Sequence, residues 1–232
     1  MEGREVRVGV EGSGLELSAY AVVPLHARRG VVVLHEILGR RPEIERVVDR
    51  FAMAGYAGVL PDLFAGGSRI VCVRNLMRAC ATGSGPPVEL VLAARRWLCG
   101  QAELAPAQVG LIGFCITGGF VLAMGRGWGA VSANYGAVPK PELMQGIAPV
   151  IACYGERDRI FGHLGKRLRD TLSSLHVDAE VHSFPTVGHS FLTDGDHPVL
   201  EWFSRPFLHA RYDPSIADDA WRRILSFFER HL

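Results

Sequence analysis

The chain has 232 residues, of which 48% are hydrophobic and 21% charged, and its formal net charge at pH 7 is +1. A chain of this length can bury a large core without disulfides or a structural metal. A net charge so close to zero gives no long-range attraction to nucleic acid or to an anionic membrane surface, which argues against both as partners.

The cysteines and the first residues indicate where the protein works. Five cysteines are an odd number and include no C-x-x-C pair, which is typical of reduced thiols rather than a disulfide framework. The opening MEGREVRVGVEGSG lacks the basic start and apolar core of a signal peptide. The longest apolar run, near residues 109–125, is interrupted by glycines and is too short for a membrane span. We therefore expect a cytoplasmic protein, either a monomer or a homodimer.

The first half of the chain predicts strands of two kinds. Residues 5–11 and 15–24 alternate polar and apolar side chains around Gly12-Ser13-Gly14, which predicts an antiparallel hairpin. Residues 30–36, GVVVLHE, form a continuous apolar run that is typical of a strand buried on both faces. The other elements expected here are a helix at 42–53, a strand at 56–64, a helix at 71–80 within an irregular Gly- and Arg-rich region, and a helix at 88–99.

The second half alternates strands and helices more regularly. A strand at 108–114 leads into a helix directly after Cys115. Further along the chain, residues 197–212 are rich in aromatic side chains that suit core packing, a pocket wall or a subunit contact. The other elements expected are strands at 129–136 and 148–158, a helix at 163–175, a strand at 178–185 and a helix at 214–232. This alternation predicts one α/β domain over residues 1–232, with a mostly parallel sheet and helices on both faces.

Reactive side chains follow several of the predicted strands. Ligands bind at the carboxyl ends of the strands in such a sheet. One strand delivers Cys115, a later one delivers Glu156 and Asp158, and the last leads to His189. A nucleophile, an acid and a histidine in this chain order match the triad of the α/β-hydrolases.

The predicted turn at Cys115 would also place hydrogen-bond donors near a substrate. A sharp turn from strand to helix lifts the thiol above the sheet and directs the backbone N–H of Ile116 toward the substrate oxygen. A second N–H should come from the loop after residues 30–36, most simply that of Ile37. The positive end of the helix behind Cys115 favours the thiolate.

Four motifs together resemble the dienelactone hydrolase family, the cysteine branch of the α/β-hydrolase fold. They are HEI at 35–37, GFCITGG at 113–119, YGERD at 154–158 and PTVGHSF at 185–191, and the final helix is also similar. The resemblance implies hydrolysis of a small-molecule ester or lactone, as by carboxymethylenebutenolidase, through a triad of Cys115, His189 and Asp158. Since no metal-binding pattern such as H-E-x-x-H is present, we expect neither a metal nor a cofactor.

The family pattern implies further roles around the triad. It favours Asp158 over Glu156 as the acid. It implies that Glu36 contacts the resting thiol and helps to deprotonate it when substrate arrives. A carboxylate beside a thiol disfavours the thiolate, so the resting cysteine can stay protonated. His35 is expected to be a structural residue beside the site.

Two positions depart from the family pattern. Thr117 stands where the motif G-x-C-x-G-G has its first glycine, and a β-branched residue crowds the turn unless its side chain finds room. Enzymes that open dienelactones hold the substrate carboxylate with arginines, one of them four residues after the catalytic histidine, and that position is Thr193 here. Arg69, Arg74 and Arg78 are candidates for a replacement cation.

Two other functions fit the same residues. One is a general carboxylesterase or thioesterase with an apolar pocket, which would prefer an ester without a carboxylate. The other is a catalytically silent binding or redox-sensing protein that kept the fold, with Cys115 as a regulatory thiol. Loss of the triad geometry would favour this last alternative.

Overall fold

The computed structural model describes residues 3–64, 67–195 and 207–232, so residues 197–206 of the aromatic-rich segment lie outside the described ranges. Within these ranges, eight strands form one sheet with the order β1-β2-β4-β3-β5-β6-β7-β8. The strands are β1 (Arg4–Val10), β2 (Leu15–Val22), β3 (Gly30–Leu34), β4 (Ala57–Pro61), β5 (Val109–Phe114), β6 (Val131–Asn134), β7 (Val150–Gly155) and β8 (Ala179–Phe184).

The strand pairing confirms the expected mostly parallel sheet. β1 and β2 form the antiparallel hairpin, and β2 pairs with β4 in the antiparallel direction. From β4 across to β8, every neighbouring pair is parallel. The carboxyl ends of β3, β5, β7 and β8 therefore lie along one edge, where ligands bind in sheets of this kind.

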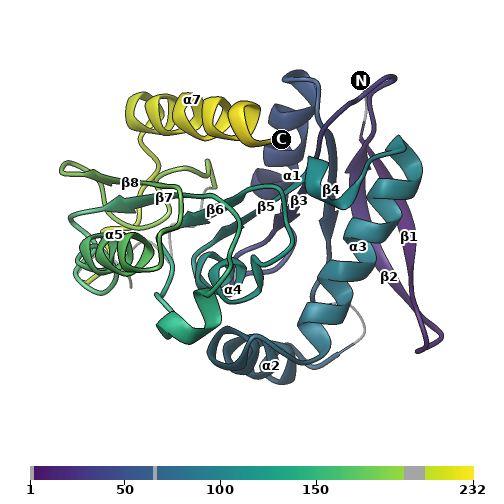
Figure 1. The fold of residues 1–232 in the computed structure, drawn as a ribbon, viewed down its shortest axis with the longest axis horizontal. Coiled ribbons are helices and arrows are strands. Elements are labelled where there is room, and N and C mark those ends of the chain that lie inside the picture. Colours follow the sequence, from purple (N-terminus) through teal and green to yellow (C-terminus); the bar gives the residue numbers. More distant parts are fainter. Residues whose placement is uncertain (1–2, 65–66, 196–206) are drawn as a thin grey trace.

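Helices cover both faces of the sheet, as expected (Figure 1). One face carries α1 (Pro42–Met53) and α7 (Pro214–His231), and the other carries α3 (Pro86–Ala102), α4 (Ile116–Met124) and α5 (Leu164–Ser174). Two short 3-10 helices span Pro106–Gln108 and Pro141–Met144. None of the described helices has both the length and the hydropathy that a membrane crossing needs.

Successive side chains of the central strands pack into two separate cores. In β3, Val31 and Val33 face the core under α1 and α7, whereas Val32 and Leu34 face the core under α3 and α4. All residues of this strand are buried. This burial explains the continuous apolar run in the sequence, because a strand covered on both faces has no side that faces solvent. Each buried valine or leucine stabilises the fold by about 1.5–3 kcal/mol relative to an exposed one.

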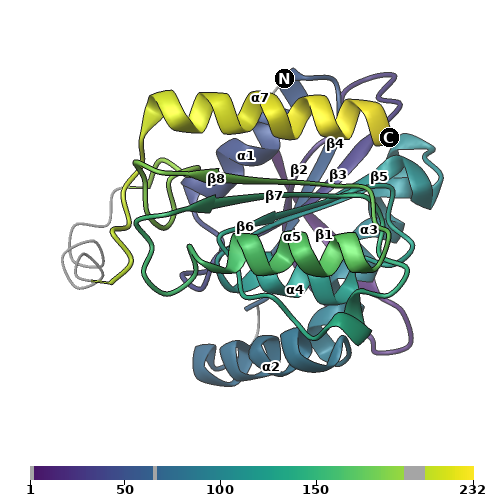
Figure 2. The ribbon, with the colours of Figure 1, turned by 60° about the vertical axis from the view of Figure 1, so that its left-hand side comes forward.

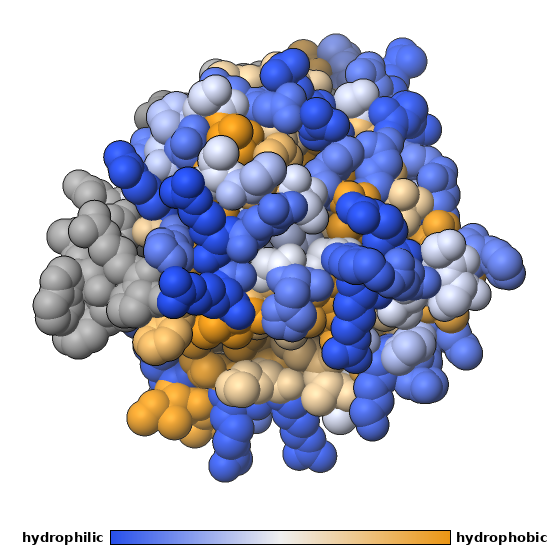
Figure 3. All heavy atoms as spheres, turned by 90° about the vertical axis from the view of Figure 1, so that its left-hand side faces the viewer, coloured by the Kyte–Doolittle hydropathy of each residue, from blue (hydrophilic) through white to orange (hydrophobic). Residues whose placement is uncertain are grey.

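The helix expected at 71–80 is longer in the structure, where α2 spans Arg69–Thr82. This helix packs mainly on α4 and α3 and forms an outer layer below them (Figure 2). Its apolar side chains Ile70, Val71 and Met77 are exposed. Figure 3 shows apolar surface at the level of this helix, at the bottom of the face drawn there.

Helix α4 lies very close to the ends of β5 and β6, because glycines line the contact. A Cβ atom on Gly118 would lie 2.5 Å from the carbonyl oxygen of Asn134, and one on Gly113 would lie 2.4 Å from that of Thr117. A side chain at either position would need the backbone to move, so only glycine permits this approach. The close packing sharpens the turn between β5 and α4, which contains Cys115.

Gly118→Ala should lower the free energy of unfolding by about 1–3 kcal/mol, because the added methyl group forces α4 away from β6. Gly100→Ala is the matched control, since Gly100 lies in α3 and a Cβ there meets nothing within 4 Å. Alanine in a helix interior should stabilise the protein by up to about 1 kcal/mol. Urea unfolding measures both effects, and equal midpoints for the two variants would contradict the close approach.

Candidate active site

Cys115 occupies the sharp turn between β5 and α4. Its φ of 58° and ψ of −121° form a sparsely populated conformation that costs on the order of 1–3 kcal/mol. Two hydrogen bonds of 3.0 Å hold the turn: the Cys115 amide donates to the Asn134 carbonyl, and the Gly118 amide donates to the Cys115 carbonyl. The half-buried thiol therefore stands at the carboxyl edge of the sheet and at the start of a helix, as in a nucleophile elbow.

Thr117 fits this turn because its hydroxyl bonds to the backbone of two strands. The residue is fully buried. The hydroxyl accepts a hydrogen bond of 2.9 Å from the Phe114 amide and lies 2.9 Å and 3.3 Å from the carbonyl oxygens of Phe114 and Leu34. Phe114 ends β5 and Leu34 ends β3, so the hydroxyl links the two strand ends. The departure from glycine is thus accommodated by specific contacts.

Asp158 and His189 form a buried pair. Nδ1 of His189 donates a hydrogen bond of 2.6 Å to Oδ2 of Asp158, and Asp158 and His189 are 2% and 4% exposed. Oδ1 of Asp158 accepts from the amides of Ile160 and Phe161, both at 2.9 Å. Nε2 of His189 is buried and has no hydrogen-bond partner in the described ranges. An imidazole held in this way can exchange a proton through Nε2.

The neighbouring charges raise the pKa of His189. Burial alone lowers this pKa, but the Cys115 thiolate and the Asp158 carboxylate outweigh burial and raise it to about 10. The imidazolium is therefore the stable form at neutral pH when the thiol is ionised, because an adjacent negative charge favours the charged ring. Cys115 and His189 thus lie close enough to interact electrostatically.

Glu36 follows β3 and faces the same site. Its Oε1 accepts hydrogen bonds from the hydroxyls of Tyr135 (3.1 Å), Thr193 (3.4 Å) and Ser190 (3.5 Å). Burial raises the pKa of Glu36, and the charge of His189 and the Tyr135 hydroxyl partly offset this. Among the described residues the donors to Glu36 are these hydroxyls, so its implied contact with the resting thiol stays a prediction.

His35 fixes the loop that follows β3. Its buried ring accepts a hydrogen bond of 3.0 Å from the Leu63 amide at Nε2, so Nδ1 carries the proton and donates to the Glu36 carbonyl at 2.8 Å. Burial lowers the pKa of His35, which suits a neutral ring. This is the structural role that the sequence indicated, and it also restrains the neighbouring Ile37 amide.

The remaining expected residues differ in whether the structure places them at the site. Ile37 and Ile116 follow the adjacent strands β3 and β5, and in the described part of the chain neither amide donates to a protein acceptor. Arg69 donates to the Ile37 carbonyl at 3.1 Å. Arg74 and Arg78 are exposed on α2, without an ion pair to any described residue. Of the three arginines, Arg69 alone contacts a residue of the expected site.

Glu156, the alternative acid, points elsewhere. It is exposed and lines a surface depression together with Lys166 and Ser183. Its backbone amide donates to the Phe184 carbonyl, which continues the pairing of β7 with β8. Asp158 is therefore the acid that holds His189.

Residues 17–232 match the model of the dienelactone hydrolase family. The chain belongs to this family. It is 26% identical over 231 residues to a carboxymethylenebutenolidase from Rhodococcus opacus, a match that covers 87% of this chain and 81% of the relative. It is 24% identical to a protein named usf from Aquifex pyrophilus, over 97% of this chain and 98% of the relative.

Solved structures agree on the fold of this dienelactone hydrolase family member. A dienelactone hydrolase-like promiscuous phosphotriesterase from metagenomic libraries superposes with a TM-score of 0.77 at 20% identity. The match covers 99% of this chain and 98% of that one. At this identity the likeness establishes the α/β-hydrolase fold, and the chemistry has to be argued from the site.

Tyr135 is a site residue that was not singled out from the sequence. It directly follows β6, has a φ of 40° and is fully buried; a positive φ is a genuine outlier for a bulky residue. Its ring centroid lies 4.8 Å from that of His189, and its hydroxyl donates to Glu36. The available signal was its place in the sequence, directly after a buried strand that ends at the same edge as β5 and β7.

The other cysteines offer less reactive thiols. Burial raises the pKa of both Cys80 and Cys153 to about 12, which keeps them protonated and weakly nucleophilic. The Cys80 thiol also donates to the Ile116 carbonyl at 3.5 Å. No group of three or more His, Cys, Asp or Glu side chains among the described residues could hold a metal ion.

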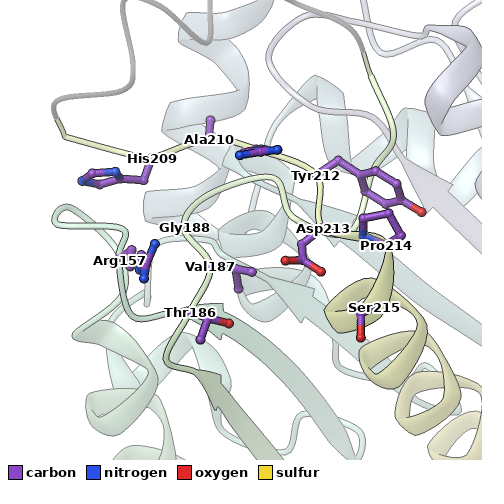
Figure 4. Close-up of a pocket in the computed structure, with 11 residues that line it drawn as sticks. Arg157, Thr186, Val187, Gly188, His209, Ala210, Tyr212, Asp213, Pro214 and Ser215 are labelled. Atoms are coloured by element: carbon purple, nitrogen blue, oxygen red, sulfur yellow. The ribbon is translucent and has the colours of Figure 1, made fainter.

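A cavity of about 690 Å³ lies beside the segment that carries His189 (Figure 4). Its walls are Arg157, residues 186–188, and residues 209–215, which lead into α7. Neither Cys115 nor Glu36 lines it, so this cavity is adjacent to the histidine segment and is not the space in front of the thiol.

Thr117→Val should destabilise the protein by about 1–3 kcal/mol, because the Phe114 amide loses its acceptor while it remains buried. Thr117→Ser keeps the hydroxyl and should lose much less. Urea unfolding of the two variants separates the hydroxyl from the methyl group. A valine variant as stable as the wild type would show that the hydroxyl does not hold the strand ends together.

Cys115→Ala should lower the pKa of His189, because it removes the thiolate while burial, which lowers this pKa, remains. NMR titration of ¹⁵N-labelled imidazole nitrogens measures the change. Cys99→Ala, on α3, serves as the control and should leave the titration unaltered. An unchanged His189 titration in the Cys115 variant would mean that thiol and imidazole do not interact.

Proposed function

We propose that the protein hydrolyses a carboxylic ester or lactone through Cys115 as the nucleophile. The observation that supports this most strongly is the buried His189–Asp158 pair, whose imidazole is acted on by the charge of Cys115. A thiol in a strained turn, an adjacent base and an acid that orients the base are the parts that nucleophilic acyl transfer needs. Membership of the dienelactone hydrolase family supports the same chemistry.

In the proposed reaction, the Cys115 thiolate adds to the ester carbonyl, and the amides of Ile37 and Ile116 donate to the oxyanion. Loss of one such donor typically lowers the rate by about 10²–10³. His189 enters this step as the imidazolium, because the charges of Cys115 and Asp158 raise its pKa to about 10. Its Nε2 proton passes to the departing alcohol, which leaves a thioester on Cys115 and a neutral ring. The same nitrogen next takes a proton from water, which hydrolyses the thioester and releases the acid. Asp158 holds the ring orientation throughout.

Glu36 tunes the thiol in this proposal. When substrate binds, the Cys115 proton passes to the carboxylate, which leaves a thiolate and a neutral carboxylic acid. After the product leaves, Glu36 returns this proton to the Cys115 thiolate, which restores the starting state. Burial of Glu36, which raises its pKa, suits this role because a proton acceptor works best when its pKa is near the working pH. In the absence of substrate, a charged Glu36 disfavours the thiolate and so limits oxidation of Cys115.

An uncharged ester is the second candidate substrate, as for a general carboxylesterase or thioesterase with an apolar pocket. Thr193 stands where a substrate-binding arginine is expected, is 6% exposed and donates to Glu36. Exposed apolar side chains occur in the segments around the site: Ile37 follows Glu36, Ile160 lies two residues after Asp158, and the Phe207 carbonyl accepts from the Arg159 amide. These side chains are 40%, 47% and 59% exposed. Such surroundings favour an acyl or alcohol group without a carboxylate, because apolar surface cannot compensate a desolvated charge.

Release of nitrophenol from p-nitrophenyl esters tests the proposal. The wild type should turn over, and Cys115→Ala should lose on the order of 10³-fold or more of kcat/KM, as expected when a nucleophile is removed. Cys99→Ala should keep the full rate. Equal rates for the wild type and the Cys115 variant would contradict the nucleophile assignment. No turnover by either protein would favour a silent binding or redox-sensing protein.

A second ester whose acyl group carries a carboxylate, measured in the same assay, separates the substrate classes. A higher kcat/KM for the neutral ester would support the apolar alternative. A preference for the charged ester would instead point to Arg69 as the anchor.

A further inference from the structure

One oxygen of the Glu36 carboxylate accepts hydrogen bonds from several hydroxyl groups. Three of them, from Tyr135, Thr193 and Ser190, converge on the single oxygen Oε1 at 3.1, 3.4 and 3.5 Å. Tyr135 comes from the end of β6, and the other two come from the segment after β8. Tyr135 is fully buried and Thr193 is 6% exposed, so neither hydroxyl can readily exchange this acceptor for bulk water.

The charged groups near Glu36 come from several elements. His189, on the segment after β8, favours the carboxylate, whereas Glu43 on α1 disfavours it. Cys115, at the start of α4, acts electrostatically on both His189 and Tyr135. Within the described ranges, no lysine or arginine forms an ion pair with Glu36, so the direct contacts that stabilise its charge are hydroxyl contacts.

On the basis of the function proposed above, we propose that Tyr135 and Thr193 are positioning residues for Glu36. Their hydroxyls act together with the charge of His189: they help to hold the carboxylate ionised and directed into the site, where it can accept the Cys115 proton. Ser190, at the longest of the three distances, is the least important donor.

The balance of effects on Glu36 explains why hydroxyls suit this task. Hydrogen bonds donated to a carboxylate favour its charged form and so oppose the effect of burial. A buried cation would stabilise the charge much more strongly and would make Glu36 a poor proton acceptor. Burial, Glu36 and Cys115 raise the pKa of Tyr135 well above its usual value, so its hydroxyl stays protonated and remains a donor. The hydroxyls therefore leave a carboxylate of intermediate basicity.

The backbone at these residues is consistent with a functional requirement. Tyr135 has a φ of 40° and Ser190 a φ of 54°, and left-handed conformations cost a residue other than glycine about 1–2 kcal/mol. In this conformation the Tyr135 ring packs against the His189 ring, and the Tyr135 hydroxyl donates to Glu36. The strain is therefore found where side chains meet the carboxylate.

The pH titration of Glu36 itself tests the proposal, independently of any substrate. In protein labelled with ¹³C at the glutamate carboxyl groups, the Glu36 resonance is the one absent from Glu36→Gln. Tyr135→Phe and Thr193→Val should each raise its titration midpoint by about one pH unit, because each removes a donor to the charged form. Thr193→Ser keeps the hydroxyl and should restore the wild-type midpoint.

A control variant separates this effect from the loss of any buried hydroxyl. Tyr154 is buried, and its hydroxyl donates to the Gly136 carbonyl at 3.0 Å. Tyr154→Phe should leave the Glu36 midpoint unchanged. Unshifted midpoints in both Tyr135→Phe and Thr193→Val, with native spectra, would overturn the proposal. A Thr193→Ser variant that titrates like Thr193→Val would overturn it as well.

Turnover measured on the same variants separates this proposal from the proposed function. The acid limb of the pH profile of kcat/KM should move upward together with the Glu36 midpoint. Shifted midpoints in a protein that hydrolyses no ester would leave the hydroxyl assignment standing while the proposed function fails. Normal ester turnover with unshifted midpoints would instead refute the hydroxyl assignment alone.

Discussion

The close packing of α4 against the ends of β5 and β6 is the constraint on which the site depends. Glycines at 113 and 118 allow backbone atoms to meet where any side chain would collide, and the chain has no room for a wider turn. Cys115 is therefore held with a positive φ, and its thiol stands free of the sheet. The hydroxyl of Thr117 joins the ends of β3 and β5 at the same point, so both strands that supply the expected oxyanion donors are fixed together.

The electrostatics of the site follow from placing several titratable groups in one buried volume. Burial alone favours the neutral form of each group. His189 nevertheless favours its charged form, because Cys115 and Asp158 act on it together. Glu36 receives weaker compensation from the imidazole and from hydroxyls. The two carboxylates therefore have different partners: Asp158 is bound by amides and by His189, whereas Glu36 is bound by hydroxyls and burial raises its pKa.

This difference bears on how a dienelactone hydrolase family member is adapted to its substrate. A site that stabilises its inner carboxylate with hydroxyls has no buried cation to offer a substrate carboxylate at Thr193. Arg69 is tied to the Ile37 carbonyl and lies 5.8 Å over the Phe64 ring, at the margin of the site. The side chains of Ile37, Ile160 and Phe207 are exposed in the segments around the site. In the proposed mechanism, Thr193 therefore bears on both substrate charge and thiol activation.

The sequence by itself determined the fold class and the order of the reactive groups. Two local patterns distinguish an exposed hairpin from strands buried on both faces. The hairpin shows alternation of polar and apolar residues at 5–11 and 15–24, and the central strands show continuous apolar runs. Because parallel strands end at one edge, the positions of Cys115, Asp158 and His189 after β5, β7 and β8 could be read in the same way. The family motifs assigned the acid between Glu156 and Asp158.

Only the tertiary structure decided which side chains meet. Tyr135 and Thr193 lie far apart in the chain, and nothing in their local sequence indicates that both donate to Glu36. The fit of Thr117 depended on carbonyl and amide groups at the ends of two strands, which no local pattern encodes. Arg69, Arg74 and Arg78 looked alike in the sequence, yet the position of α2 brings only the first to the loop after β3. The physical reason is that periodicity reports which face of an element is buried, whereas contacts between side chains depend on how the elements pack.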